Sequence, residues 1–156
     1  MLKRTVLLLI ALAFTALTSW AQQNPLVGTW KTNTAKSKSY LGAPSASRVV
    51  KYEASGTNGI RSTTDRVLSD GTRSHIEVTA YFDGSTAPYN GVQGRDAIRI
   101  KRIDANTYQV FYMKSGETVQ INFWIVSQDG KTLTTVSTGV GSDNKVFSRI
   151  VVADKQ

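Results

Sequence analysis

Apolar and polar residues alternate with a period of two along most of the chain beyond residue 48. The alternation is regular from Ile76 to Phe82, and it is cleanest from Val119 to Ile125. This period is typical of strands that bury one face, because successive side chains of a strand point to opposite sides. Phe82 and Phe123 fall on the apolar faces of their strands, and we therefore expect both rings to point inward.

Short runs of Gly, Asp, Asn and Ser separate these segments, and such residues favour the tight turns of β-hairpins. Beyond the N-terminal apolar segment, no apolar residues recur at the spacing of three and four that predicts a helix. We expect about nine consecutive antiparallel strands, at residues 26–31, 49–52, 60–68, 76–82, 98–101, 108–114, 119–125, 132–138 and 146–152.

A long meander of strands has two exposed edges unless it closes on itself, and closure into a barrel removes them. The sequence therefore predicts an all-β fold, an up-and-down antiparallel β-barrel of about 8–10 strands. A two-sheet β-sandwich is the alternative.

The stretch from Thr32 to Ser47 lacks this alternation and is rich in Lys, Ser, Ala, Gly and Pro. We expect it to be a connection. Long loops inside compact domains are often lids or flaps. An ordered loop or a short helical turn that simply bridges two strands is the alternative.

The N-terminus has the pattern of a secretory signal. Lys3 and Arg4 precede an apolar run that is short for a membrane span, and the small residues Ser19 and Ala21 follow it. We expect cleavage after Ala21, with export to a bacterial periplasm or the extracellular medium. This leaves one domain over residues 22–156. An uncleaved membrane anchor is the alternative.

Composition narrows the chemistry. The chain has no cysteine, which excludes disulfides, thiolate metal sites and cysteine nucleophiles. The formal net charge is +8 over 156 residues. Without Lys3 and Arg4 the remaining 17 basic and 11 acidic residues give +6. We expect no stable membrane insertion, because no run beyond the signal is long enough to span a bilayer. We expect no nucleic-acid partner, because the protein is expected to be exported and no aromatic platform accompanies the basic residues.

The densest basic run contains Arg95, Arg99, Lys101 and Arg102. Arg99 and Lys101 alternate with apolar residues, and we expect them on the solvated face of a strand. Weak contact with anionic envelope polymers is the alternative interpretation of this run.

Residues for catalysis or metal binding are scarce. His75 is the only histidine, and it shares a strand face with Glu77. Zinc sites need three or four ligands at recognisable spacing, and no such set is visible. No serine lies in a nucleophile-elbow motif. We therefore expect no catalytic set, no metal and no cofactor, and we expect His75 and Glu77 to be solvated.

Gly28 and Trp30 form a Gly-x-Trp motif at the start of the first predicted strand, and Arg149 lies on the last one. This arrangement resembles that of lipocalins and intracellular fatty-acid-binding proteins. The resemblance implies that Gly28, Trp30 and Arg149 close the barrel base, with Arg149 packed on Trp30. The second lipocalin motif and the helical lid of fatty-acid-binding proteins are absent, and Val151 stands where the latter have an anchoring tyrosine.

A closed barrel of this size either fills its interior with side chains or leaves room for one small ligand. If a ligand is bound, the strand aromatics and the last-strand arginine are the candidates to contact it: Tyr52, Phe82, Tyr112, Phe123 and Arg149.

Three functions compete. The leading hypothesis is a non-enzymatic exported protein that holds a small apolar or amphipathic ligand inside the barrel. The first alternative is a structural or interaction module of the envelope with a filled core, which an apolar patch outside, around Trp124, would favour. The second is an enzyme whose dispersed catalytic residues include His75.

Overall fold

The computed structural model describes residues 24–41, 47–67, 71–141 and 143–156, and the expected signal at 1–21 lies outside them. The described residues form ten strands: β1 (Gly28–Leu41), β2 (Arg48–Ser55), β3 (Gly59–Val67), β4 (Arg73–Tyr81), β5 (Asp83–Pro88), β6 (Ala97–Arg102), β7 (Thr107–Lys114), β8 (Glu117–Val126), β9 (Thr132–Val140) and β10 (Val146–Lys155).

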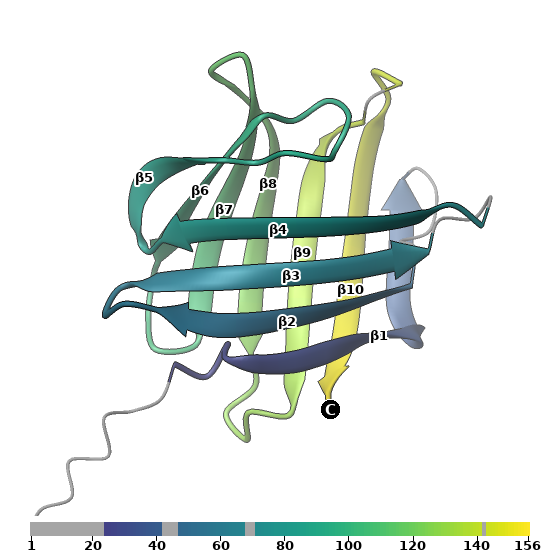
Figure 1. Ribbon diagram of the computed structural model, residues 1–156. Helices are drawn as coiled ribbons and strands as arrows, with labels where there is room; N and C mark the ends of the chain where they lie inside the picture. Colours follow the sequence, from purple (N-terminus) through teal and green to yellow (C-terminus); the bar gives the residue numbers. More distant parts are fainter. Residues whose placement is uncertain (1–23, 42–46, 68–70, 142) are drawn as a thin grey trace, which may run out of the picture.

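All ten strands belong to one antiparallel sheet, in the order β4-β3-β2-β1-β10-β9-β8-β7-β6-β5. Each strand therefore pairs with its neighbours in the chain, except that β4 and β5 do not pair with each other, and β1 also pairs with β10. The sheet curls into a nearly closed barrel, in which β2–β4 pass steeply across β7–β10 (Figure 1). This confirms the all-β barrel and excludes the two-sheet sandwich.

The two ends of the sheet, β4 and β5, are separated in the chain by Phe82 alone. The Phe82 amide donates to the Asn58 carbonyl at 2.9 Å, and the Arg102 amide donates to the Phe82 carbonyl at 3.2 Å. The amide and the carbonyl of Phe82 are thus both hydrogen-bonded, the first to the turn before β3 and the second to the end of β6. Its side chain is buried against the ring of Tyr108, with the ring centroids 5.1 Å apart.

The expected connection from Thr32 to Ser47 is wrong over its first ten residues, because β1 continues to Leu41. β1 pairs with β2 only as far as Lys31, and then follows β10 alone, past an irregularity between Asn33 and Lys38. A half-strand paired on one side and exposed on both faces needs no apolar alternation, so its sequence reads as a loop.

β5 was not expected either. It pairs in a ladder only with β6, and Ala87 is its one buried residue. Pro88 ends the strand. Proline has no amide hydrogen to donate to a ladder, and it is tolerated on an edge strand because one side of that strand has no ladder partner.

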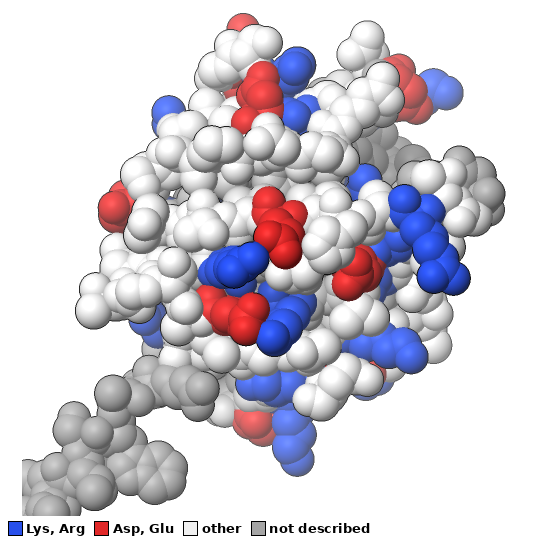
Figure 2. Space-filling view, in the orientation of Figure 1, with Lys and Arg blue, Asp and Glu red and all other residues white. Residues whose placement is uncertain are grey.

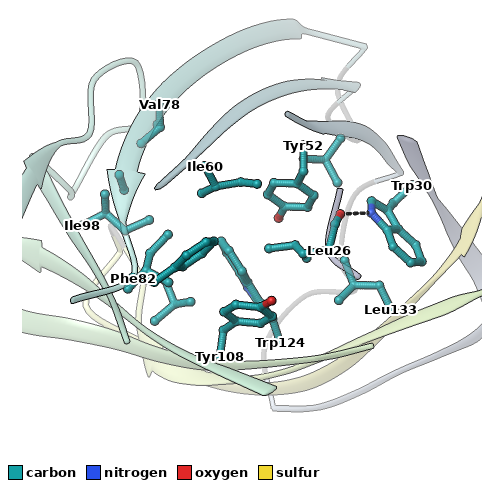
Figure 3. Close-up of a cluster of buried hydrophobic side chains, with 14 of the residues drawn as sticks. Leu26, Trp30, Tyr52, Ile60, Val78, Phe82, Ile98, Tyr108, Trp124 and Leu133 are labelled. Carbon is teal, nitrogen blue, oxygen red and sulfur yellow. Dashed lines mark hydrogen bonds between the residues drawn. The ribbon is translucent and has the colours of Figure 1, made fainter. Parts of the chain in front are cut away.

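One end of the barrel is filled with side chains (Figure 3). Trp30 is fully buried there, and its indole Nε1 donates to the Leu26 carbonyl at 2.8 Å. Tyr108 is also fully buried, and its hydroxyl donates to Asn24 Oδ1 at 2.6 Å. The polar atoms of these two large rings are therefore satisfied, as burial requires. Leu133 and Ile60 complete the cluster.

The expected contact between Arg149 and Trp30 is wrong. The residue opposite Trp30 on β10 is Lys155, whose Nζ lies 5.0 Å from the ring centroid. Arg149 comes before Lys155 on β10 and is opposite Ser39 of β1. It therefore belongs to the other half of the barrel. At Gly28, which has φ +136, a Cβ would lie 2.5 Å from Lys155 Cε. Glycine and tryptophan do meet a cation here, but it is Lys155.

The inward orientation expected for Phe123 is also wrong. The Phe123 side chain is 38 % exposed on the outside of β8, whereas the adjacent Trp124 is 4 % exposed and points inward. The inward positions of β8 begin with the polar residues Gln120 and Asn122. The alternating apolar residues of β8 are therefore on its outer face. Its inner face carries Gln120 and Asn122, because the interior next to them is polar.

The outside of β2–β4 carries mixed charges, which Figure 2 shows as adjacent blue and red side chains. Lys51 pairs with Glu53 at 2.8 Å, and Arg61 pairs with Glu77 at 2.9 Å. The part of the chain that the structure describes contains no helix with the length and hydropathy of a membrane span.

Candidate ligand-binding cavity

The half of the barrel away from Trp30 contains a cavity of about 670 Å³. The strand register shows the division along single strands. On β8, Gln120 and Asn122 line the cavity, Trp124 both lines it and packs in the cluster, and Val126 packs in the cluster without lining the cavity. On β10, Arg149 and Val151 line it, whereas Ala153 packs in the cluster. A filled base and a hollow upper half are therefore built by the same strands.

One part of the cavity wall is apolar. Trp124 and Tyr52 contact each other at 5.4 Å between ring centroids, and both line the cavity. Val50 on β2, Ile76 on β4 and Ile98 on β6 extend this wall. Each of the five is less than 5 % exposed to solvent, so the wall offers an apolar molecule a surface that is already shielded from water.

The other part of the wall is cationic. Four arginines line the cavity: Arg48 on β2, Arg66 on β3, Arg95 between β5 and β6, and Arg149 on β10. No Asp or Glu is among the described residues that line it. Since arginine remains protonated in proteins, these side chains give the interior a positive charge that no lining carboxylate balances.

Arg95 is held by its neighbours. Its guanidinium lies 4.7 Å from the centroid of the Tyr112 ring and donates to Gln120 Oε1. The Gln120 amide in turn donates to Asn122 Oδ1 at 2.5 Å. Gln120 and Asn122 are 5 % and 3 % exposed. This chain of contacts fixes a charged group at the cavity wall, although Arg95 itself lies outside any strand.

Arg149 and Arg48 are less well partnered. The Arg149 guanidinium lies 4.2 Å from the Phe147 ring centroid. Burial lowers the pKa of Arg149, and repulsion from Arg95 and Arg48 lowers it further. The Nε of Arg48 is buried and has no hydrogen-bond partner among the described residues. Arg95 and Arg48 therefore both repel Arg149, across a space that contains an unused donor.

Two phenols add neutral donors to this wall. Burial raises the pKa of Tyr52, an effect that Arg48 partly offsets. Burial also raises the pKa of Tyr112, whose ring meets that of Tyr89 at 5.0 Å between centroids. Both hydroxyls therefore stay protonated at neutral pH and can donate a hydrogen bond to an acceptor in the cavity.

A second hollow of about 390 Å³ adjoins the cavity on the side of β2–β4. Arg48 and Arg66 border both spaces, together with Ser47 and Val67. Arg48 and Arg66 are directly opposite each other in the β2–β3 ladder. Like charges in that position destabilise a sheet, although Arg66 Nε donates to Ser74 Oγ at 2.6 Å.

The structure divides the ligand-contact candidates chosen from the sequence. Tyr52, Tyr112 and Arg149 all line the cavity. Phe82 is buried but packs in the filled cluster, and Phe123 lies outside the barrel. Three candidates are thus brought together, and two are not.

The ligand-contact residues predicted from the sequence did not include Arg48, Arg66 and Arg95. Arg48 is in phase with Val50 and Tyr52 on β2, so the period-two pattern places all three on one face. That signal could have identified Arg48 as an interior cation. Arg95 lies in an irregular segment, and no periodicity gives its direction.

His75 is on the outer face of β4, where its side chain is 58 % exposed. Its Nδ1 is 2.6 Å from Asp65 Oδ1, and its Nε2 is 3.5 Å from Glu77 Oε1. The neighbouring Ser74 is on the inward face and accepts the hydrogen bond from Arg66. The serine and the histidine of this strand therefore face opposite sides.

Comparison with known proteins identifies a solved structure with a similar fold. No protein-family model matches the chain, and no curated protein matches it. Among solved structures, the chain is similar to zebrafish ileal bile acid-binding protein complexed with cholic acid, with a TM-score of 0.51 and 12 % sequence identity. The match covers 85 % of this chain and 98 % of that one. The similarity shows a shared barrel fold.

Proposed function

We propose that this protein binds one small amphipathic molecule inside the barrel, with an anionic head group at Arg48, Arg95 and Arg149. The apolar part of the molecule lies against Trp124 and the neighbouring aliphatic side chains. The observation that carries the proposal is an interior lined by four arginines and, among its described lining residues, by no carboxylate.

The volume supports a ligand of modest size. Ligand pockets usually measure about 300 to 1,000 Å³, and the cavity of about 670 Å³ falls within that range. An interaction module with a filled core does not need such a space. The chain shares its barrel fold with a bile acid-binding protein that was solved in complex with cholic acid.

The charge supports an anion. Burying a cation without a counter-charge is costly, and the repulsion of Arg149 by Arg48 and Arg95 adds to that cost. A carboxylate, sulfate or phosphate group would offset both the cost of burial and the repulsion. Hydrogen bonds from guanidinium groups to such anions are about twice as strong as neutral ones.

The division of the wall supports an amphipath. Cations lie at Arg95 and Arg149, whereas Trp124, Ile76 and Ile98 provide apolar contact in the same cavity. A purely apolar molecule would leave the arginines uncompensated, and a small inorganic anion would leave the apolar wall uncovered. Only a molecule with both parts satisfies both sides of the cavity.

Calorimetric titration with three probes of the same chain length tests the proposal. Dodecanoate should bind more tightly than dodecanol, and dodecyltrimethylammonium should bind least. Arg149→Gln should weaken dodecanoate binding by about tenfold or more, since hydrogen bonds to charged groups contribute about 1.5–3 kcal/mol. Arg99→Gln, which removes an exposed arginine from β6, is the matched control and should leave the affinity unchanged.

Equal affinity for the anion and the cation would contradict the proposal, as would an Arg149→Gln variant that binds dodecanoate like the wild type. Mass spectrometry of an extract from the purified protein, made under denaturing conditions, would identify any natural ligand that co-purifies.

We also infer that the protein is exported. The inference depends on the charged, apolar and small-residue segments that end at Ala21. Expression in a bacterial host should give a mature protein that begins at Gln22 in the periplasmic or extracellular fraction. An intact mass that includes residues 1–21 in the cytoplasmic fraction would contradict it.

A further inference from the structure

The two outer faces of the barrel differ in charge. On β2–β4, cations and carboxylates alternate in ion pairs such as Arg61–Glu77 (Figure 2). The outer face of β7–β10 is built differently. Six of its apolar residues are Phe111 on β7, Ile121, Phe123 and Ile125 on β8, Val136 on β9 and Ile150 on β10. We call these six residues the outer apolar face.

The strand register makes this face continuous. Phe123 is directly opposite Val136, and Val136 is directly opposite Ile150, so apolar side chains cross three strands in one row. Phe123, Val136 and Ile125 are 38 %, 39 % and 39 % exposed. The other outward residues in the same rows are Thr, Ser, Gln or Val, none of them charged. Contiguous apolar surface of this kind is rare on monomers unless it binds something.

Basic residues border this face on both long sides. On β6, Arg99 is opposite Phe111, and Lys101 is opposite Gln109. On β1, Lys38 is opposite Ile150. None of these three cations is ion-paired with a carboxylate of the described residues. An uncharged apolar strip between two cationic margins complements a surface that is apolar inside and anionic at its boundary.

We propose that the outer apolar face docks on an anionic lipid surface. Phe123 and its aliphatic neighbours enter the boundary between head groups and acyl chains, and Arg99, Lys101 and Lys38 contact the lipid phosphates. Interfacial binding of this kind depends on buried apolar area together with attraction to anionic lipids. It requires no insertion of the backbone. Docking is independent of what the cavity binds, but it would bring the protein to the place where amphipathic molecules concentrate.

The charge pattern argues against a second copy of the chain as the occupant. If two outer apolar faces met around a twofold axis, the basic margin of each copy would face a basic margin of the other, whichever edges were apposed. Such like-charge contacts are unfavourable. An anionic partner turns the same margins into attractive contacts.

Vesicle sedimentation of the purified protein tests the proposal. The protein should sediment with vesicles of phosphatidylcholine mixed with phosphatidylglycerol and remain free with phosphatidylcholine alone. Raising NaCl from about 0.1 M to about 1 M should release it, since the Debye length falls from about 10 Å to about 3 Å. Both tests use lipid alone, so no cavity ligand is required.

Two pairs of variants separate the apolar and the cationic contributions. Phe123→Asp should lower vesicle partitioning by about tenfold or more. Tyr81→Asp, which alters a 48 % exposed aromatic residue on β4, should not. Lys101→Gln should lower partitioning by about fivefold. Lys51→Gln, on the outside of β2, removes the same charge and should have a smaller effect.

Each alternative result would overturn the proposal. Absence of sedimentation with either vesicle would exclude docking, while dodecanoate titration would still report on the cavity. Loss of binding in Lys101→Gln but not in Phe123→Asp would show charge attraction without the apolar face. A wild-type dimer in light scattering that Phe123→Asp converts to a monomer would assign the face to contact between copies.

Discussion

Lys155, the penultimate residue, lies over the ring of Trp30, with Nζ 5.0 Å from the ring centroid. The two residues are opposite each other in the β1–β10 ladder, which joins the first strand to the last. The contact therefore lies where the barrel closes. Gly28 lies beside it and has no Cβ to displace Lys155.

Trp30→Ala should lower the free energy of unfolding by about 3 to 5 kcal/mol, because the ring is fully buried and its loss leaves a void. Lys155→Met keeps the stem over the ring and removes the charge. It should cost only about 0.5 to 1 kcal/mol, as expected for a cation over an aromatic ring at an exposed site. Urea denaturation followed by circular dichroism measures both. Equal costs for the two variants would show that the charge, and not the ring, supports the closure.

Removal of an interior arginine should stabilise the empty protein. Arg149→Met keeps the side chain volume against Phe147 but eliminates a partly buried charge that Arg95 and Arg48 repel. Replacing poorly compensated charges by apolar groups of similar size is often stabilising. We expect a gain of about 1 kcal/mol in the absence of ligand, measured by thermal or urea unfolding, together with weaker binding of dodecanoate. Arg99→Met on the outside of β6 is the control, and its stability should change little. A destabilised Arg149→Met would show that Arg149 is structural.

The only histidine reports on the charged outer face. Hydrogen bonds to Asp65 and Glu77 raise the pKa of His75 above its ordinary value of 6.5. Because the folded-state pKa is the higher one, the stabilising contribution is complete below about pH 6.5 and is lost as pH rises through the folded value. NMR titration of the single imidazole should show the raised pKa, and Asp65→Asn should lower it. The stability difference between wild type and His75→Gln should shrink over the same pH interval. An imidazole that titrates at 6.5 or below would contradict the contacts.

Strand positions with strong periodicity were predictable from the sequence, whereas their inward or outward direction was not always so. The alternation from Ile76 to Phe82 marks the buried face of β4 correctly, because the space inside that strand is apolar. On β8 the same argument fails. Gln120 and Asn122 face a polar cavity, and Phe123 is left outside. A period-two pattern identifies two faces, but only knowledge of what fills the barrel says which is the inner one.

The cavity was only partly predictable for the same reason. Tyr52 follows from its strand phase. Arg149 was a ligand candidate as the arginine of the last strand, although the resemblance to lipocalins and fatty-acid-binding proteins placed it on Trp30, where Lys155 lies instead. Arg95 does not, because it lies in a segment without regular structure, where direction depends on contacts with Tyr112 and Gln120. The second half of β1 was missed because its pairing with β10 depends on backbone hydrogen bonds and not on an apolar face.

Substitutions at the neighbouring residues Phe123 and Trp124 should separate the two sides of the barrel wall. Trp124→Ala removes a cavity-lining ring that packs on Tyr52, and it should weaken dodecanoate binding by about tenfold through lost apolar contact. Phe123→Ala removes an outward ring of the same strand. It should cost about 1 kcal/mol of stability or less through lost cross-strand packing, with dodecanoate affinity unchanged. Calorimetry and urea unfolding of the two variants provide the comparison. Weaker dodecanoate binding in Phe123→Ala than in Trp124→Ala would place the binding surface outside the barrel and contradict the interior site.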